Sequence, residues 1–188
     1  DPTAGEAAGA RCPDGTYGAS LEVTLANQQT SRSAAPDFTI DTKAPTVEAT
    51  APYLVFSPNA DGKRDALPIA QKSSSEERWT ASIVSAKKQV VKTYSWTGSV
   101  KDFAWDATDD SGNRVADGAY TYSISTEDRA GNRAKGEIAG IVVDTRVAKA
   151  YLTAELAAFS PNGDGIKDSQ RLSIVASIPD GLESWTVR

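Results

Sequence analysis

Two polar stretches of the chain have the residue types and the spacing of a calcium-binding loop. The first reads SPNADGKRD over residues 57–65, and the second reads SPNGDGIKD over residues 160–168. In both, oxygen-bearing side chains stand at the first, third, fifth and ninth positions, and a Gly at the sixth would turn the chain. These are ligand positions of an EF-hand-type loop, whose seventh ligand is a backbone carbonyl. The candidate ligands are Ser57, Asn59, Asp61, Lys63 (its carbonyl) and Asp65 in the first stretch, and Ser160, Asn162, Asp164, Ile166 (its carbonyl) and Asp168 in the second.

The same residues also fit a rigid turn that binds no metal. The bidentate acid expected at the twelfth position is missing, because Pro68 and Arg171 stand there. The Asn and Asp side chains would then accept backbone N–H groups of their own loop. A further carboxylate, from Asp106, Asp109 or Asp110, would complete a calcium site only if the fold brings it near. Both interpretations stay open, so no cofactor is certain and Ca²⁺ is the one candidate.

The two stretches belong to a longer repeat. Phe56 and Phe159, which precede them, are 103 residues apart. The same offset relates DGTY at 14–17 to DGAY at 117–120, and IDTKA at 40–44 to VDTRV at 143–147. A shared offset of domain size predicts tandem domains rather than a solenoid.

The repeat divides the chain into three segments. Residues 46–148 form one complete unit, residues 1–45 the C-terminal part of a preceding unit, and residues 149–188 the N-terminal part of a following one. We therefore expect the sequence to be a fragment of a longer protein. The two outer segments are complementary parts of one unit that lack only its middle. We hypothesise that they complete a sandwich together, within or between chains.

Short alternating segments predict an all-β fold. Thr80–Ser85 and Tyr120–Ser125 alternate polar and apolar residues, as half-buried antiparallel strands do. Gln89–Tyr94 and Lys135–Val143 are further predicted strands, and Gly136 and Gly140 in the last predict a bulge or a close approach. Turn residues separate these segments, a pattern typical of a β-sandwich. The Trp spacing predicts core positions at Trp79, Trp96 and Trp105, and the lone Cys12 is expected to be a buried free thiol.

One long motif resembles a known family. WDATDDSGNRVADGAYTY, residues 105–122, is similar to immunoglobulin-like domains related to the C-terminal part of the flagellar hook-capping protein. Ala107 stands where that family usually has Gly, so the turn there is expected to differ. FSPNGDGIKD resembles a motif of bacterial envelope and surface proteins. The resemblance implies tandem immunoglobulin-like antiparallel β-sandwich domains in a secreted, periplasmic or cell-surface protein.

Composition narrows the function classes. The net charge of −5 argues against nucleic-acid binding, and no apolar run is long enough to span a membrane. The chain has no His, which removes Ser-His-Asp and Cys-His catalysis, so an enzyme is not expected. We expect a structural or scaffold segment. Its expected partners are neighbouring immunoglobulin-like units or other envelope proteins, and self-association through the incomplete outer segments is a further expectation. An adhesin or partner-binding module, or a hook-cap-like assembly factor, is the alternative.

Overall fold

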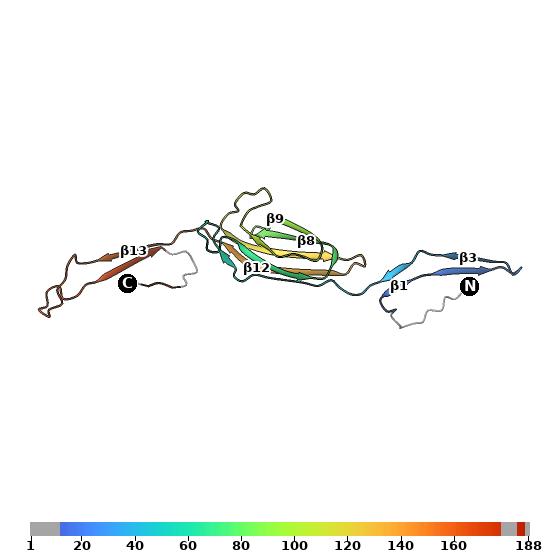
Figure 1. The fold of residues 1–188 in the computed structure, drawn as a ribbon, viewed down its shortest axis with the longest axis horizontal. Helices are drawn as coiled ribbons and strands as arrows, with labels where there is room; N and C mark the ends of the chain where they lie inside the picture. Colours follow the sequence, from blue (N-terminus) through green and yellow to red (C-terminus); the bar gives the residue numbers. More distant parts are fainter. Residues whose placement is uncertain (1–11, 178–183, 187–188) are drawn as a thin grey trace. The chain divides into compact units, whose positions relative to one another are not determined.

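The computed structural model describes residues 12–177 and 184–186, and these residues contain strands and no helix (Figure 1). The chain divides after Val143 into two compact parts, which are described separately below. None of the described residues forms a helix with the length and hydropathy needed to cross a membrane.

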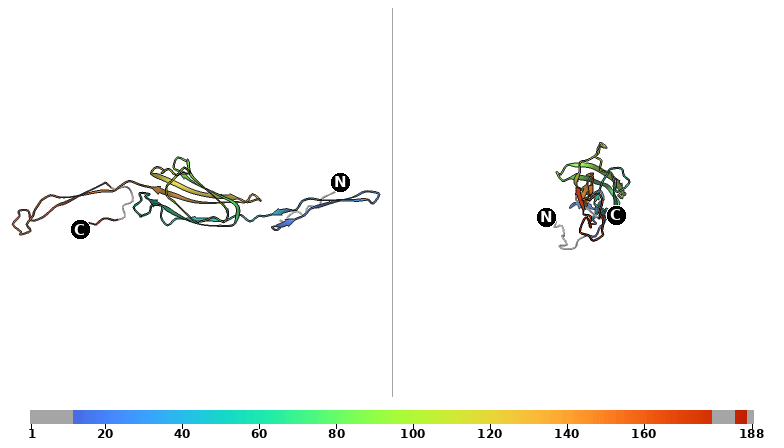
Figure 2. Two further views of the ribbon diagram at one scale, coloured as in Figure 1. Left: turned by 45° about the horizontal axis from the view of Figure 1, so that its top comes forward. Right: turned by 90° about the vertical axis from the view of Figure 1, so that its left-hand side faces the viewer.

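Residues 46–143 form a sandwich of two sheets, whose strands run along a common direction in Figure 2. The larger sheet has the order β6-β12-β11-β8-β9, and the smaller sheet has the order β10-β7-β5. The strands are β5 (Val47–Thr50), β6 (Val55–Phe56), β7 (Leu67–Ser73), β8 (Glu76–Ser85), β9 (Val90–Gly98), β10 (Phe103–Trp105), β11 (Gly118–Glu127) and β12 (Arg133–Val143).

The alternating sequence pattern produces the buried face of each sheet. In β11, Tyr120, Tyr122 and Ile124 are buried, while the residues between them are less so. The β11–β12 register shifts after Tyr120, opposite Gly140. Gly140 has a φ of 75°, which glycine adopts at no steric cost. The four strands and the bulge inferred from the sequence are therefore confirmed.

Aromatic residues fill the space between the sheets. Trp79 and Trp105 are fully buried, and their indole N–H groups donate to the carbonyls of Ser74 (3.3 Å) and Thr108 (3.0 Å). Trp96 is half-buried and lies near Tyr94 and Phe103 at the open edge of the sandwich. The predicted core role of the Trp residues holds at Trp79 and Trp105 and only partly at Trp96.

One polar pair lies inside this core. The hydroxyl of Tyr122 donates to Oε1 of Gln71 on the opposite sheet. The amide nitrogen of Gln71 donates in turn to the carbonyl of Lys101 at 2.7 Å. Both polar ends of the buried Gln71 amide are therefore satisfied, as burial in an apolar core requires.

Before the sandwich, the chain forms two small antiparallel pairs that reproduce the β11–β12 pairing. β1 (Gly15–Tyr17) pairs with β4 (Phe38–Ile40), and β2 (Ser20–Thr24) pairs with β3 (Thr30–Ala34). Gly15 lies opposite Ile40 just as Gly118 lies opposite Val143, at the same 103-residue offset. We call residues 12–45 the N-terminal hairpins.

The second compact part reproduces the β5–β7 pairing. β13 (Lys149–Ala154) pairs with β14 (Leu172–Ser177), and Tyr151 lies opposite Val175. Glu48 and Lys72, at the same offset, form the equivalent pair in the sandwich. We call residues 149–177 the C-terminal hairpin.

The expectation for Cys12 is wrong. Its thiol is exposed, because the residue precedes β1 and lies outside the sandwich core. Its exposure follows from its place in the chain and not from its residue type.

A close contact between the sheets gives a stability prediction. A Cβ atom built on Gly136 would lie 3.1 Å from Cγ2 of Ile124 and 3.3 Å from Cγ1 of Val47. We expect Gly136→Ser to lower the free energy of unfolding by about 1–3 kcal/mol through overpacking. Val47→Ala in the same chain should recover part of that loss, because it removes the methyl groups in the way. Thermal and urea denaturation of the two single variants and the double variant measure this coupling. Strictly additive losses would contradict it.

Candidate functional site

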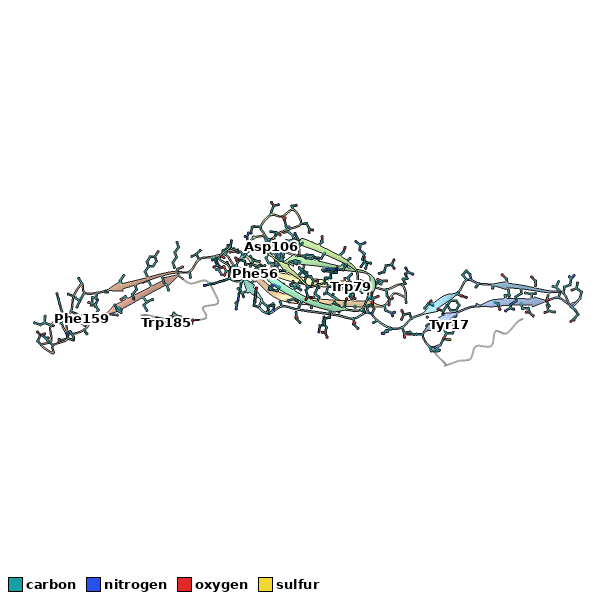
Figure 3. The ribbon with its side chains drawn as sticks, in the orientation of Figure 1. Tyr17, Phe56, Trp79, Asp106, Phe159 and Trp185 are labelled. Carbon is teal, nitrogen blue, oxygen red and sulfur yellow. The ribbon has the colours of Figure 1, made fainter. Side chains whose placement is uncertain are left out.

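The two SPN loops, residues 57–65 and 160–168, have the same backbone structure. The N–H of Ser57 donates to the carbonyl of Arg64 at 3.0 Å, and the N–H of Ser160 donates to the carbonyl of Lys167 at 3.0 Å. An apolar residue directly precedes each loop. It is Phe56 before the first loop and Phe159 before the second, and both are labelled in Figure 3. The second loop thus repeats the backbone hydrogen bond that closes the first.

The last Asp of each loop holds the turn together. Asp65 accepts the N–H of Ala60 at 2.7 Å and the N–H of Gly62 at 2.8 Å. Asp168 accepts the equivalent N–H groups of Gly163 and Gly165 at 2.9 and 2.7 Å. Each carboxylate therefore binds two backbone donors, one with each oxygen.

The middle Asn and Asp of each loop are also engaged with one another. Asp61 accepts the N–H of Lys63 at 2.8 Å and the side-chain amide of Asn59 at 3.2 Å. Its own N–H donates to Oδ1 of Asn59 at 3.1 Å. Asp164 makes the same three bonds with Asn162 and Ile166.

These bonds lower the pKa of the carboxyls in the second loop. The pKa of Asp164 lies below its usual value chiefly because the N–H of Ile166 donates to it, and the pKa of Asp168 is lowered chiefly by the N–H groups of Gly163 and Gly165. The resulting stability is present above the ordinary carboxyl pKa and is lost as the pH falls through the lowered value.

The cationic neighbours of the first loop do not neutralise it. Arg64 lies over the ring of Tyr53, with Cζ 4.8 Å from the centroid. In the part of the chain that is described, the ion pairs lie elsewhere and include none of the four loop Asp residues. The loop carboxylates are thus compensated by backbone donors.

The bonds of Asn59, Asp61 and Asp65 fit the rigid-turn interpretation, and the calcium interpretation stays a prediction. Among the described residues, no three Asp, Glu or Cys side chains gather to hold a metal ion. The predicted loop sites have only two carboxylates each and would depend on hydroxyl, amide and carbonyl oxygens for their other ligands.

The acidic loop that the sequence offered as a source of further ligands is engaged in bonds of its own. Asp106 accepts the hydroxyl of Thr108 at 2.7 Å, and Asp109 accepts the N–H groups of Ser111 and Asn113 at 2.9 and 2.8 Å. Ala107 has a positive φ of 57°, a backbone conformation that Gly adopts at no steric cost.

Asp110 covers part of the outer edge of β9, a role that the sequence did not indicate. Its N–H donates to the carbonyl of Val91 at 3.0 Å, and its carboxylate accepts the N–H and the hydroxyl of Thr93 at 3.1 and 2.9 Å. Covering an edge strand in this way blocks unwanted strand pairing.

The joints between repeats, which we define as residues 40–45 and 143–148, have further contacts that the sequence did not predict. Asp14 accepts both the N–H and the hydroxyl of Thr42, at 3.1 and 2.9 Å. The side-chain amide of Asn132 donates to the carbonyl of Asp41 at 3.0 Å. Asp14 belongs to the DG turn at residues 14–15 and Asn132 ends the DRAGN turn at residues 128–132, but nothing in the sequence indicated that these turns contact the joint.

The calcium interpretation predicts a metal-dependent melting temperature. If the SPN loops bind calcium, Tm should rise in excess calcium relative to chelator, by several degrees at about 100 times the dissociation constant. The double variant Asp61→Ala, Asp164→Ala should lose that shift. Equal melting temperatures in calcium and chelator for the unaltered chain would leave the rigid turn as the function of both loops.

A difference between the two loops predicts a stabilising change. Ala60 has φ of 65°, while its counterpart Gly163 has φ of 81°. Ala60 is exposed, so Ala60→Gly removes backbone strain without losing a buried methyl, and we expect a gain of up to about 1 kcal/mol. The control is Ala70→Gly, on the exposed face of β7, which should destabilise. Thermal denaturation measures both, and a loss of stability in Ala60→Gly would contradict the argument.

Comparisons with known proteins match one part of this chain to a family model. A comparison with curated proteins found no match. A similar solved structure is the crystal structure of a tetra-tandem repeat in the extending region of a large adhesion protein, with 13% identity and a TM-score of 0.40. That alignment covers 87% of this chain and 45% of the other, so the chain spans less than half of that structure. Residues 57–130 match the family model described as the FlgD Ig-like domain, which confirms the resemblance inferred from the sequence.

Proposed function

We propose that this chain is a non-enzymatic structural segment of a bacterial envelope or surface protein, in which immunoglobulin-like modules act as spacers or assembly units. The observation that carries the proposal is the repetition of one strand register at one offset. The N-terminal hairpins repeat the β11–β12 register, and the C-terminal hairpin repeats the β5–β7 register. A chain in which parts of one module recur at a fixed offset is typical of an array whose repeats set length and orientation.

The joints support this function because they have local hydrogen bonds. Asp41 accepts the N–H of Lys43 at 3.0 Å, and Asp144 accepts the N–H of Arg146 at 3.0 Å. The guanidinium of Arg146 also binds Asp144 in a bidentate pair at 2.9 and 2.8 Å. Pro45 restricts φ at the first joint, whereas Ala148 stands at the second. The two joints are therefore expected to differ in stiffness.

The core of the sandwich supports a spacer more than an enzyme. Its titratable groups include the half-buried Tyr94 and the buried Tyr122, whose pKa values are raised mainly by burial, so they stay protonated at neutral pH. The described acidic side chains of the loops and joints accept bonds from neighbouring backbone and side-chain donors. Such groups hold turns in place, as a spacer requires. In the alternative function, that of an adhesin module, a partner would dock on these loops.

A replacement experiment separates the spacer from the partner-binding alternative. In the protein that contains this chain, residues 46–148 are replaced by an unrelated immunoglobulin-like module of matched length, or are deleted. A spacer predicts that the replacement preserves surface presentation and that the deletion shortens the reach, as measured by the accessibility of an epitope placed beyond the module. Loss of function in the matched replacement would instead assign partner binding to this module.

A further inference from the structure

One dipeptide of the second SPN loop has the residue types of a spontaneous deamidation site. Asn162 is followed by Gly163, and no other Asn in the sequence precedes a Gly. Both residues are exposed to water, in the loop that follows the labelled Phe159 in Figure 3. In deamidation, the backbone nitrogen of the next residue attacks the asparagine side chain, and glycine permits this most readily because it has no Cβ in the way. The dipeptide is therefore suited to a chemical modification that needs water and no enzyme.

The reaction replaces the side-chain amide by a carboxyl group. The backbone nitrogen of Gly163 gives its proton to hydroxide and attacks Cγ of Asn162, which forms a cyclic imide. The bond from Cγ to Nδ2 breaks, and Nδ2 takes up a proton and leaves as ammonia. Water then opens the imide at either of its carbonyls. Position 162 becomes an aspartate, or an isoaspartate when the main-chain bond is the one that breaks, and the loop gains a negative charge in both cases.

The folded loop holds the attacking nitrogen in another bond. The N–H of Gly163 donates to Oδ1 of Asp168 at 2.9 Å, and Oδ2 of the same carboxylate accepts the N–H of Gly165 at 2.7 Å. The step that makes the nitrogen a nucleophile must break the first of these bonds. It also places a negative charge on the nitrogen beside a carboxylate, and a neighbouring like charge disfavours the charged form. Asp168 therefore opposes the attack in two ways.

The side chain of Asn162 is held as well. Its Oδ1 accepts the N–H of Asp164 at 3.2 Å, and its Nδ2 donates to Oδ2 of Asp164 at 3.0 Å. The pKa of Asp164 is lowered, chiefly because the N–H of Ile166 donates to it, so the carboxylate that holds the amide stays ionised at neutral pH. Both the nitrogen that attacks and the amide that leaves are thus bonded within the closed loop. The reaction requires the loop to open.

The first SPN loop provides an internal comparison. Asn59 makes the equivalent pair of bonds with Asp61, at 3.1 and 3.2 Å, and the N–H of Ala60 donates to Asp65 at 2.7 Å. Among these four positions, only the residue after the asparagine differs in type between the two loops. The Cβ of Ala60 obstructs the attack even when the loop opens. The two loops therefore share one set of bonds but differ in chemical reactivity.

We propose that Asn162 is a deamidation site whose reaction the closed loop suppresses through Asp168, so that opening of the loop is converted into a lasting change of charge. The product does not remake the same closed loop. A carboxylate at position 162 lacks the Nδ2 donor and would face Oδ2 of Asp164 at the position where the amide now lies 3.0 Å away. Two carboxylates in contact repel each other, so the modified loop favours the open form. This site is independent of the spacer function, because it rests on the loop alone.

Peptide mass spectrometry of the full chain, incubated at neutral pH, tests the proposal. The mass gain of an amide-to-acid change should appear at position 162 and not at Asn59. Mass separates this reaction from isomerisation at the Asp-Gly pairs, which leaves the mass unchanged. The rate in the folded chain should be about ten- to a hundredfold lower than in denaturant, the factor expected when a charge-assisted hydrogen bond must first break.

Variants of the two loops identify the cause of the suppression. Asp168→Ala should raise the rate in the folded chain to near the rate in denaturant, and should change the rate in denaturant little. Asp65→Ala is the matched control, since it opens the first loop and should leave the rate at Asn162 unchanged. Ala60→Gly should make Asn59 reactive, and Gly163→Ala should remove the reaction at position 162. Equal rates in the folded and denatured chain, or no response to Asp168→Ala, would overturn the proposal.

The Asn162→Asp variant tests the one-way step separately, because it reproduces one product of the reaction. Hydrogen exchange at the amides of Gly163 and Gly165 should be faster in this variant than in the unaltered chain. Exchange at Ala60 and Gly62 in the first loop should stay the same in both chains. Unchanged exchange at Gly163 and Gly165 would show that the loop closes over the new carboxylate, and would overturn the conversion of loop opening into a lasting change.

Discussion

The structure depends on the packing of the β11–β12 face against β7 and β5. Tyr122, Ile124 and Ile141 come from one sheet, and Leu67 and Ile69 come from the other, and all five are buried. A two-stranded hairpin alone is marginally stable in water, and burial of an apolar face is what gives three or more strands a stable fold. The complete repeat satisfies this requirement within one chain.

The sequence predicted those features that depend on local pattern. Alternation identified β8 and β11, and the pair of Gly residues in Lys135–Val143 indicated a bulge that the structure places at Gly140. The 103-residue offset predicted that distant segments share one register, and they do. These inferences succeeded because strand period and turn chemistry are encoded within a few residues.

The features that the sequence did not predict depend on long-range placement. The contact of Asn132 with the joint at Asp41 joins residues 91 positions apart, and the cover of β9 by Asp110 joins residues 17 apart. For the SPN loops the difficulty is different. A calcium loop and an Asx turn both need inward-pointing oxygens at alternate positions, so one spacing fits both. Only the bonding of Asp61 and Asp65 to backbone N–H groups shows how the turn is held.

Tandem repeats with nearly identical registers risk pairing with the wrong neighbour during folding. Core substitutions in this chain oppose that error. If the N-terminal hairpins replaced β11 and β12 in the sandwich, Ala19 would face Gln71, and the buried amide would lose the hydroxyl of Tyr122. An unsatisfied buried group of this kind costs about 1–3 kcal/mol. Ser33 would at the same time add a side chain at the position of Gly136, where a Cβ atom would lie only 3.3 Å from a methyl of Val47. These two positions therefore make the N-terminal hairpins poor substitutes for β11 and β12 of the complete repeat. The repeats share a backbone register, and a few core residues distinguish the strands of one repeat from those of the next.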